Sequence, residues 1–154
     1  TNTVLLDTRK TIPGLRLAQK YAVKIGGGQN HRVGLFDAFL IKENHIRAAG
    51  VISNAIKKAK KVNNSARIEI EVETIDELKD ALEHEPDWIL LDNFSIPDMV
   101  RAVKIAKQKA KLEASGGISD HDNLLEIAKT GVDFISMGEL TKNIKAVDLS
   151  LLLD

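Results

Sequence analysis

Residues 67–117 read RIEIEVETIDELKDALEHEPDWILLDNFSIPDMVRAVKIAKQKAKLEASGG, and this stretch decides the fold. Short apolar runs alternate in it with longer segments of helical periodicity. The run at 67–72 has β-branched residues at every second position, which predicts a strand. Two more apolar runs predict strands at 88–91 and 111–114. Strands that alternate with helices form a parallel sheet, because each crossover returns the chain to the same edge.

The same alternation extends in both directions along the chain. Further strands are predicted at 4–6, 38–41 and 134–137. Helices are predicted at 46–62, 74–82, 95–107 and 120–129. Thr74 and Glu77 form a capping box, and Ser95 is an N-cap with Pro97 in the first turn behind it. Gly131 predicts the end of the last helix.

Polar or glycine residues follow directly after each predicted strand. In a (β/α) barrel the carboxyl ends of all strands form the active face, whereas a doubly wound sheet gathers its site at one switch point. Six polar strand ends therefore favour an α/β fold built as a parallel (β/α) barrel, TIM-barrel-like but of reduced strand number. We expect residues 1–154 to form a single barrel domain.

The composition limits the class of protein. The chain has 154 residues, with 22 basic and 22 acidic side chains and no cysteine. The absence of a net charge argues against nucleic-acid binding, and no apolar run approaches the about 20 residues that a membrane span needs. We expect a cytoplasmic protein without disulfides. Because Thr1 leads almost at once into a strand, we expect the chain to be part of a longer protein.

Positive charge is concentrated near the amino terminus. Residues 6–45 read LDTRKTIPGLRLAQKYAVKIGGGQNHRVGLFDAFLIKENH. Arg9 and Lys10 follow the first strand, and arginine grips a carboxylate or phosphate through two hydrogen bonds. His31 and Arg32 follow three glycines that match neither a P-loop nor a dinucleotide fingerprint. We expect a site for a small polyanion, with His31 and Arg32 against a carboxylated ring.

Three later groups extend this candidate site. Lys42 ends a strand and either faces the site or pairs with Glu43. Glu71 and Asp92 end successive strands, where carboxylates can share a Mg²⁺ ion, hold ribose hydroxyls, act as acid and base, or stabilise a cationic sugar. Glu69 and Glu73 share the face of Glu71 by alternation, so pattern alone does not single it out.

Glycine-rich turns follow the last two strands. They contain Ser115, Gly116, Gly117, Ser136, Met137 and Gly138. In barrels such turns bind phosphate through backbone N–H groups and a helix N-terminus. No zinc-ligand spacing and no G-x-S-x-G element occurs, so we expect neither a zinc site nor acyl hydrolysis.

These motifs, taken together, resemble the quinolinate phosphoribosyltransferases, also called carboxylating nicotinate-nucleotide pyrophosphorylases. LDTRKTIPGLRLAQKYAV, GGG, NHR and DAFLIKENHI are followed in the family's order by EVET, LDNFS, EASGGI and ISMGELT. The likeness covers essentially the whole chain and corresponds to the family's C-terminal barrel domain. Its N-terminal domain has no counterpart in these residues.

The resemblance implies that quinolinate and phosphoribosyl pyrophosphate give nicotinate mononucleotide, pyrophosphate and CO₂ with Mg²⁺, a step of NAD biosynthesis. It places Arg9, His31, Arg32 and Lys42 against the quinolinate carboxylates and Lys10 at the pyrophosphate. It gives Glu71 and Asp92 to the ribose hydroxyls and the metal, and makes these two and Lys10 the catalytic set. Ser115, Gly116, Gly117, Ser136 and Gly138 would hold the 5′-phosphate.

The resemblance also implies a homodimer or larger assembly, in which an arginine from the partner's N-terminal domain completes the site. We therefore expect little or no turnover from this chain alone. Glu139 departs from the family pattern, which has a small residue there. Two other hypotheses stay open: a related phosphoribosyltransferase for another acidic ring, and an anion-binding barrel without activity.

Overall fold

The computed structural model describes residues 1–118 and 121–153. One parallel sheet of six strands has the order β1-β6-β5-β4-β3-β2. The strands are β1 Val4–Leu6, β2 Ala38–Ile41, β3 Arg67–Val72, β4 Trp88–Asp92, β5 Lys111–Ser115 and β6 Phe134–Ser136. The helices are α1 Arg16–Ile25, α2 Glu43–Ala49, α3 Ile52–Val62, α4 Ile75–Leu82, α5 Ile96–Ala106, α6 His121–Lys129 and α7 Glu139–Lys142.

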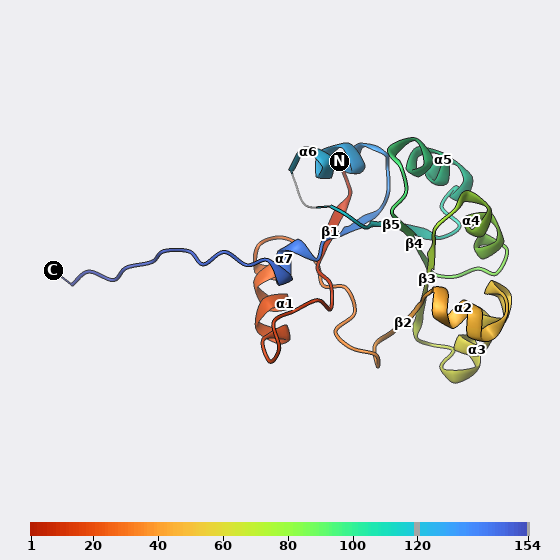
Figure 1. The fold of residues 1–154 in the computed structure, drawn as a ribbon, viewed down its shortest axis with the longest axis horizontal. Helices are drawn as coiled ribbons and strands as arrows, with labels where there is room; N and C mark the ends of the chain where they lie inside the picture. Colours follow the sequence, from red (N-terminus) through yellow and green to blue (C-terminus); the bar gives the residue numbers. More distant parts are fainter. Residues whose placement is uncertain (119–120, 154) are drawn as a thin grey trace.

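The sheet curves, and helices α2 to α6 lie along its outer side (Figure 1). β1 and β2 are its two edges, so the strands form an α/β barrel that stays open between them. Beside β1, the backbone of Gln29 donates to Leu5 O at 2.8 Å and accepts from Asp7 N at 3.2 Å. The segment after the three glycines therefore continues the sheet at this edge. None of the helices in the described part is both long and apolar enough to cross a bilayer.

The six predicted strands are confirmed. Three have the predicted bounds, and the other three differ from the prediction by one residue at the carboxyl end. The helix expected at 46–62 is wrong, because α2 and α3 are separate helices. Gly50 between them has φ +91°, a backbone conformation that cannot continue an α-helix. Asp120, expected to start the last helix, lies outside the described residues.

The capping signals are largely confirmed. Thr74 Oγ1 accepts from Glu77 N at 3.2 Å, and Ser95 Oγ accepts from Asp98 N at 3.3 Å. The carboxylate of Glu77 accepts from the backbone N–H of Glu73 rather than from that of Thr74. The second hydrogen bond of the capping box is therefore displaced by one residue toward the amino terminus. No sequence signal discussed above predicted α1 or α7.

Alternation along the strands separates the apolar side chains that pack against the helices from the side chains that face the cavity. Ile70, Ile89 and Leu91 are fully buried in the apolar cluster between sheet and helices. The residues between them, such as Glu71 and Leu90, point to the inside of the barrel, because successive strand side chains face opposite ways. Parallel pairing brings all carboxyl ends to one rim, which is where the site forms.

Candidate active site

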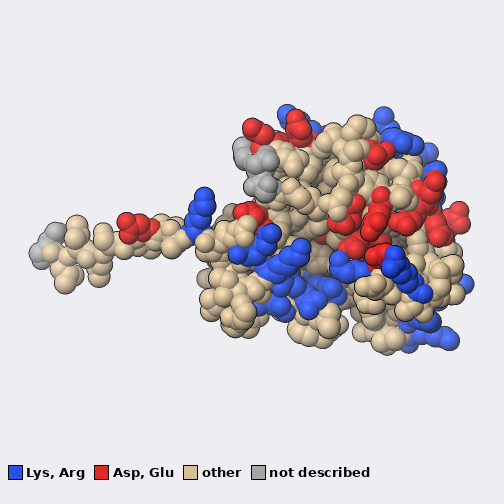
Figure 2. Space-filling view, viewed as in Figure 1, with Lys and Arg blue, Asp and Glu red and all other residues tan. Residues whose placement is uncertain are grey.

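A cavity of about 660 Å³ opens at the carboxyl ends of the strands. All the predicted site residues line it: Arg9, Lys10, His31, Arg32, Lys42, Glu71, Asp92, Ser115, Gly116, Gly117, Ser136 and Gly138. Asn93, Glu113, Glu139 and Lys142 also line it and had no predicted role. A second hollow of about 570 Å³, beside α1, has mainly apolar walls and offers little for chemistry. On the face drawn in Figure 2, basic side chains gather next to a group of acidic ones.

Some of the basic residues build the site rather than line it. Lys20 is buried and forms an ion pair with buried Asp7, while its Nζ donates to His31 O at 3.0 Å. Asp7 also accepts from His31 N at 2.9 Å and from Asn30 Nδ2 at 2.6 Å. Asp7 therefore connects the end of β1 to α1 and to the loop that carries His31. The buried ammonium group of Lys20 is engaged by these contacts and does not serve as a ligand-binding group.

Arg9 and Arg32 form a cationic wall. Arg9 Nε is buried and has no hydrogen-bond partner within the described ranges. Burial lowers the pKa of the Arg32 guanidinium, and the charge of Arg9 lowers it further. Two guanidiniums that repel each other, one with a buried unused donor, are stabilised by an anion between them.

Lys42 pairs with Glu71 across β2 and β3. The alternative partner, Glu43, pairs instead with Arg47 one helical turn along α2. Lys42 keeps about half of its side chain exposed, at 49%, so its amine can exchange Glu71 for an incoming carboxylate.

Glu71 is the penultimate residue of β3 and Asp92 the last residue of the neighbouring β4, and both line the cavity. Asp92 Oδ2 accepts from Asn93 Nδ2 at 2.9 Å. Two carboxylates at one rim offer hard oxygen donors, which Mg²⁺ takes together with water and phosphate oxygens. The donor set therefore fits a Mg²⁺ ion.

The two glycine turns follow β5 and β6, and both line the cavity. Gly116 has φ +99°, and a Cβ there would lie 2.2 Å from Asn93 Oδ1, so only glycine fits. A Cβ at Gly138 would lie 3.5 Å from Lys10 Cδ and 3.6 Å from Lys142 Cε. The side-chain stems of Lys10 and Lys142 therefore lie beside the turn at Gly138, where their ammonium groups can neutralise a phosphate.

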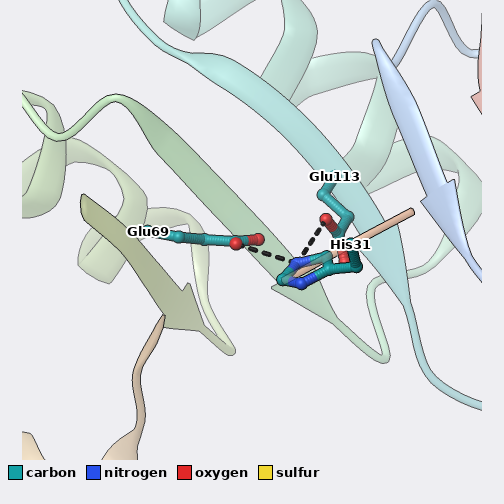
Figure 3. A group of neighbouring side chains, drawn as sticks. All are labelled: His31, Glu69 and Glu113. Atoms are coloured by element: carbon teal, nitrogen blue, oxygen red, sulfur yellow. Dashed lines mark ion pairs between the residues drawn. The ribbon is translucent and has the colours of Figure 1, made fainter. Parts of the chain in front are cut away.

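His31 is buried at the base of the cavity between Glu69 and Glu113 (Figure 3). Burial lowers the pKa of His31, but the contacts with Glu113 and Glu69 outweigh this and raise the pKa to about 9. Burial raises the pKa of Glu69 to about 7. Nδ1 of His31 accepts from Arg32 N at 2.8 Å and therefore carries no proton, so Nε2, Glu69 and Glu113 share the additional proton of the cluster.

A family model described as "Quinolinate phosphoribosyl transferase, C-terminal domain" matches residues 1–152. The chain belongs to this family. It is 46% identical over 149 residues, 96% of this chain and 51% of its relative, to a probable carboxylating nicotinate-nucleotide pyrophosphorylase of Bacillus subtilis. A protein with the same name from Methanocaldococcus jannaschii is 49% identical over 152 residues, which are 94% of this chain and 53% of that one.

Solved structures agree with the fold. The nicotinate-nucleotide pyrophosphorylase of Francisella tularensis superposes with a TM-score of 0.94 at 60% identity, over 97% of this chain and 53% of that one. A thiamine phosphate pyrophosphorylase of Pyrococcus furiosus, at 16% identity and a TM-score of 0.58, shares the fold alone. This chain spans about half the length of the relatives that it matches.

Sequence reasoning missed Glu113 and Lys142 in this family member. Glu113 stands two residues before Ser115 on an inward face of β5, a signal that alternation offered. Lys142 lies one helical turn beyond Gly138, but the short α7 that brings it back was not predicted. Glu139, the departure from the family pattern, accepts from Asn143 Nδ2 at 2.7 Å, which engages its carboxylate. The individual roles of the predicted residues stay predictions.

Proposed function

We propose that this chain is the barrel of an enzyme that transfers a phosphoribosyl group from phosphoribosyl pyrophosphate to quinolinate. The nucleotide then loses CO₂, and the products are nicotinate mononucleotide and pyrophosphate, a step of NAD biosynthesis. One observation carries the proposal: a single cavity gathers a guanidinium wall, a carboxylate pair and two glycine turns. Membership of the family and the names of its relatives support the same reaction.

The acidic ring would bind at the cationic wall. Arg9 and Arg32 repel each other, and the buried Nε of Arg9 has no partner in the part of the chain described. Lys42 also lines the cavity, paired with Glu71. A ring with two neighbouring carboxylates would satisfy these cations and release Lys42 from Glu71.

The phosphoribosyl group would lie between the carboxylates and the glycine turns. Backbone N–H groups of the turns would hold the 5′-phosphate, and Glu71 and Asp92 the ribose hydroxyls. The ring nitrogen attacks C1 of the ribose as pyrophosphate leaves, and the carboxylates stabilise the cationic sugar. Lys10 neutralises the leaving pyrophosphate. Mg²⁺, when held by Glu71 and Asp92, would supply further positive charge to that group.

Decarboxylation follows on the nucleotide: the bond to CO₂ breaks, the positive ring nitrogen stabilises the electron pair left on the neighbouring carbon, and a proton from water then binds that carbon. We further propose that the protein acts as a homodimer or larger assembly in the cytoplasm. The exposed apolar side chains of α1, Leu17, Tyr21 and Ile25, support an assembly. The names of the plant relatives place those proteins in chloroplasts or mitochondria, so the cellular location of this protein has to be measured separately from its activity.

The decisive experiment joins this chain to the remaining half of its Francisella tularensis relative, in place of the matching residues. The chimera should form nicotinate mononucleotide from quinolinate and phosphoribosyl pyrophosphate with Mg²⁺. Arg32→Ala should abolish product, whereas Lys57→Ala, on the solvent face of α3, should leave the rate unchanged. A folded chimera that binds both substrates without forming product would favour the inactive anion-binding barrel.

A further inference from the structure

The base of the cavity holds two buried glutamates against one buried histidine (Figure 3). Glu69 is 0% exposed, Glu113 1% and His31 7%. His31 Nε2 lies 2.9 Å from Glu69 Oε2 and 3.2 Å from Glu113 Oε2. His31 Nε2 and the four carboxylate oxygens form no hydrogen bond inside the described ranges, so these contacts are ion pairs. Two buried carboxylates in this state would be strongly destabilising, so the imidazole is the group that offsets them.

The other side of the imidazole faces the backbone. Nδ1 of His31 accepts from Arg32 N at 2.8 Å. A ring nitrogen that accepts a hydrogen bond carries no proton, so the proton of the imidazole lies on Nε2, toward the glutamates. Nε2 then has no lone pair for a metal ion, although the three side chains are close enough to surround one. Within the protein, Nδ1 accepts a hydrogen bond and Nε2 lies in two ion pairs.

The hydrogen bond at Nδ1 connects the imidazole through the backbone to the cationic wall of Arg9 and Arg32. The N–H that Nδ1 accepts belongs to Arg32, whose guanidinium lines the cavity and donates to Ala38 O at 3.3 Å. The position of the imidazole ring therefore helps to set the position of that peptide and of the guanidinium beyond it.

We propose that Glu69 and Glu113 are positioning residues, which hold His31 through Nε2 so that His31 and Arg32 face an acidic ring in the correct orientation. The role for ligand binding rests on the proposed function. The positioning role predicts a change in anion affinity of opposite sign to the change that charge alone predicts. Removing a buried negative charge beside an anion site should strengthen anion binding by charge alone, whereas losing the position of His31 and Arg32 should weaken it.

The test compares two substitutions of Glu113 by titrating quinolinate into this chain and measuring the dissociation constant. Glu113→Ala should weaken binding about tenfold, because the imidazole then keeps only Glu69 at Nε2 and loses one of the two side chains that orient it. Glu113→Gln keeps an acceptor and should stay within about threefold of the unsubstituted chain. Leu112→Ala removes a buried side chain on the opposite face of β5 and controls for loss of packing. Tighter binding in both Glu113 variants, or no change in Glu113→Ala, would overturn the proposal.

A second measurement does not depend on the ligand or on activity. Nitrogen-15 spectra of the unsubstituted chain should show a protonated, slowly exchanging Nε2 at His31, and Glu113→Ala should make that proton exchange faster. An unprotonated Nε2 would overturn the positioning role. If the unsubstituted chain binds no quinolinate, the proposed substrate fails, and the spectra decide the contact between His31 and Glu113 by themselves.

Discussion

At the scale of single residues, the basic side chains divide into those that build the site and those left to bind. Lys20 is buried against Asp7. Arg16 donates to Arg9 O at 3.1 Å and to Val33 O at 3.3 Å, so its guanidinium joins two loops. Charges without such partners, above all the guanidinium Nε of Arg9, are the ones that a ligand can satisfy.

The buried ion pair gives a first prediction. Lys20→Met should lower the free energy of unfolding by about 3–5 kcal/mol, because it leaves the carboxylate of Asp7 buried without its partner. Lys24→Met, on the exposed side of the same helix, is the matched control and should change stability little. Urea unfolding of both variants measures the difference. Equal stabilities of the two variants would contradict the structural role of Lys20.

The histidine and its glutamates predict how stability depends on pH. The folded-state pKa is about 9 for His31 and about 7 for Glu69, both above the values of unconstrained side chains. The folded chain therefore holds more protons than the unfolded chain between about pH 4.5 and pH 9, so its stability falls as the pH rises through this window. Urea unfolding at several pH values should show this fall, and a flatter profile in Glu69→Gln. Stability that rises toward pH 9 would contradict it.

At the scale of elements, the turns after β5 and β6 combine unusual backbone with small side chains. Gly116 and Gly117 both have positive φ, at +99° and +62°. Gly116 also lies directly against Asn93 at the end of β4, itself at φ +54°. Two neighbouring strands therefore turn together, and a change in one turn must move the other.

Gly116→Ala tests this arrangement. The new methyl group would meet Asn93 Oδ1, and we expect affinity for phosphoribosyl pyrophosphate to fall more than about tenfold as the turn shifts. Gly27→Ala is the control, because Gly27 has a similar φ of +95° with nothing within 4 Å of the added Cβ. Calorimetry on both variants separates the steric effect from backbone strain. Equal losses in the two variants would show that backbone strain alone matters.

At the scale of the whole molecule, helix α1 presents an exposed apolar face. Leu17, Tyr21 and Ile25 are 73%, 67% and 69% exposed along α1. An apolar hollow of about 570 Å³ lies against the same helix. Exposed apolar patches of this kind mark surfaces that associate with other protein.

We therefore expect this chain to self-associate at micromolar concentration. Leu17→Glu with Ile25→Glu should shift it toward the monomer, because charge opposes burial of the α1 face. Val62→Glu, an exposed apolar residue on α3, is the control and should leave the association unchanged. Sedimentation equilibrium measures the mass. A chain that is already monomeric at high concentration would contradict this prediction.

Periodicity along the chain was sufficient for the strands, and capping residues for the starts of α4 and α5. It failed where the backbone changes direction without a proline, as at Gly50, which divides α2 from α3. It also missed α1, where Gln19 and Lys20 are buried while apolar residues of the helix are exposed. A local pattern assumes that burial follows hydrophobicity, and a buried ion pair reverses that relation.

By itself the sequence determined the parallel α/β fold and the set of residues at the strand ends, because both follow from local spacing. Only the tertiary structure decided how deep each side chain lies. Glu69, Glu71 and Glu73 alternate identically, yet Glu69 is buried under the cavity, Glu71 lines it and Glu73 is exposed. Spacing sets the face on which a side chain lies. Depth depends on which distant segments pack over it, here the loop of His31, which Asp7 and Lys20 hold in place.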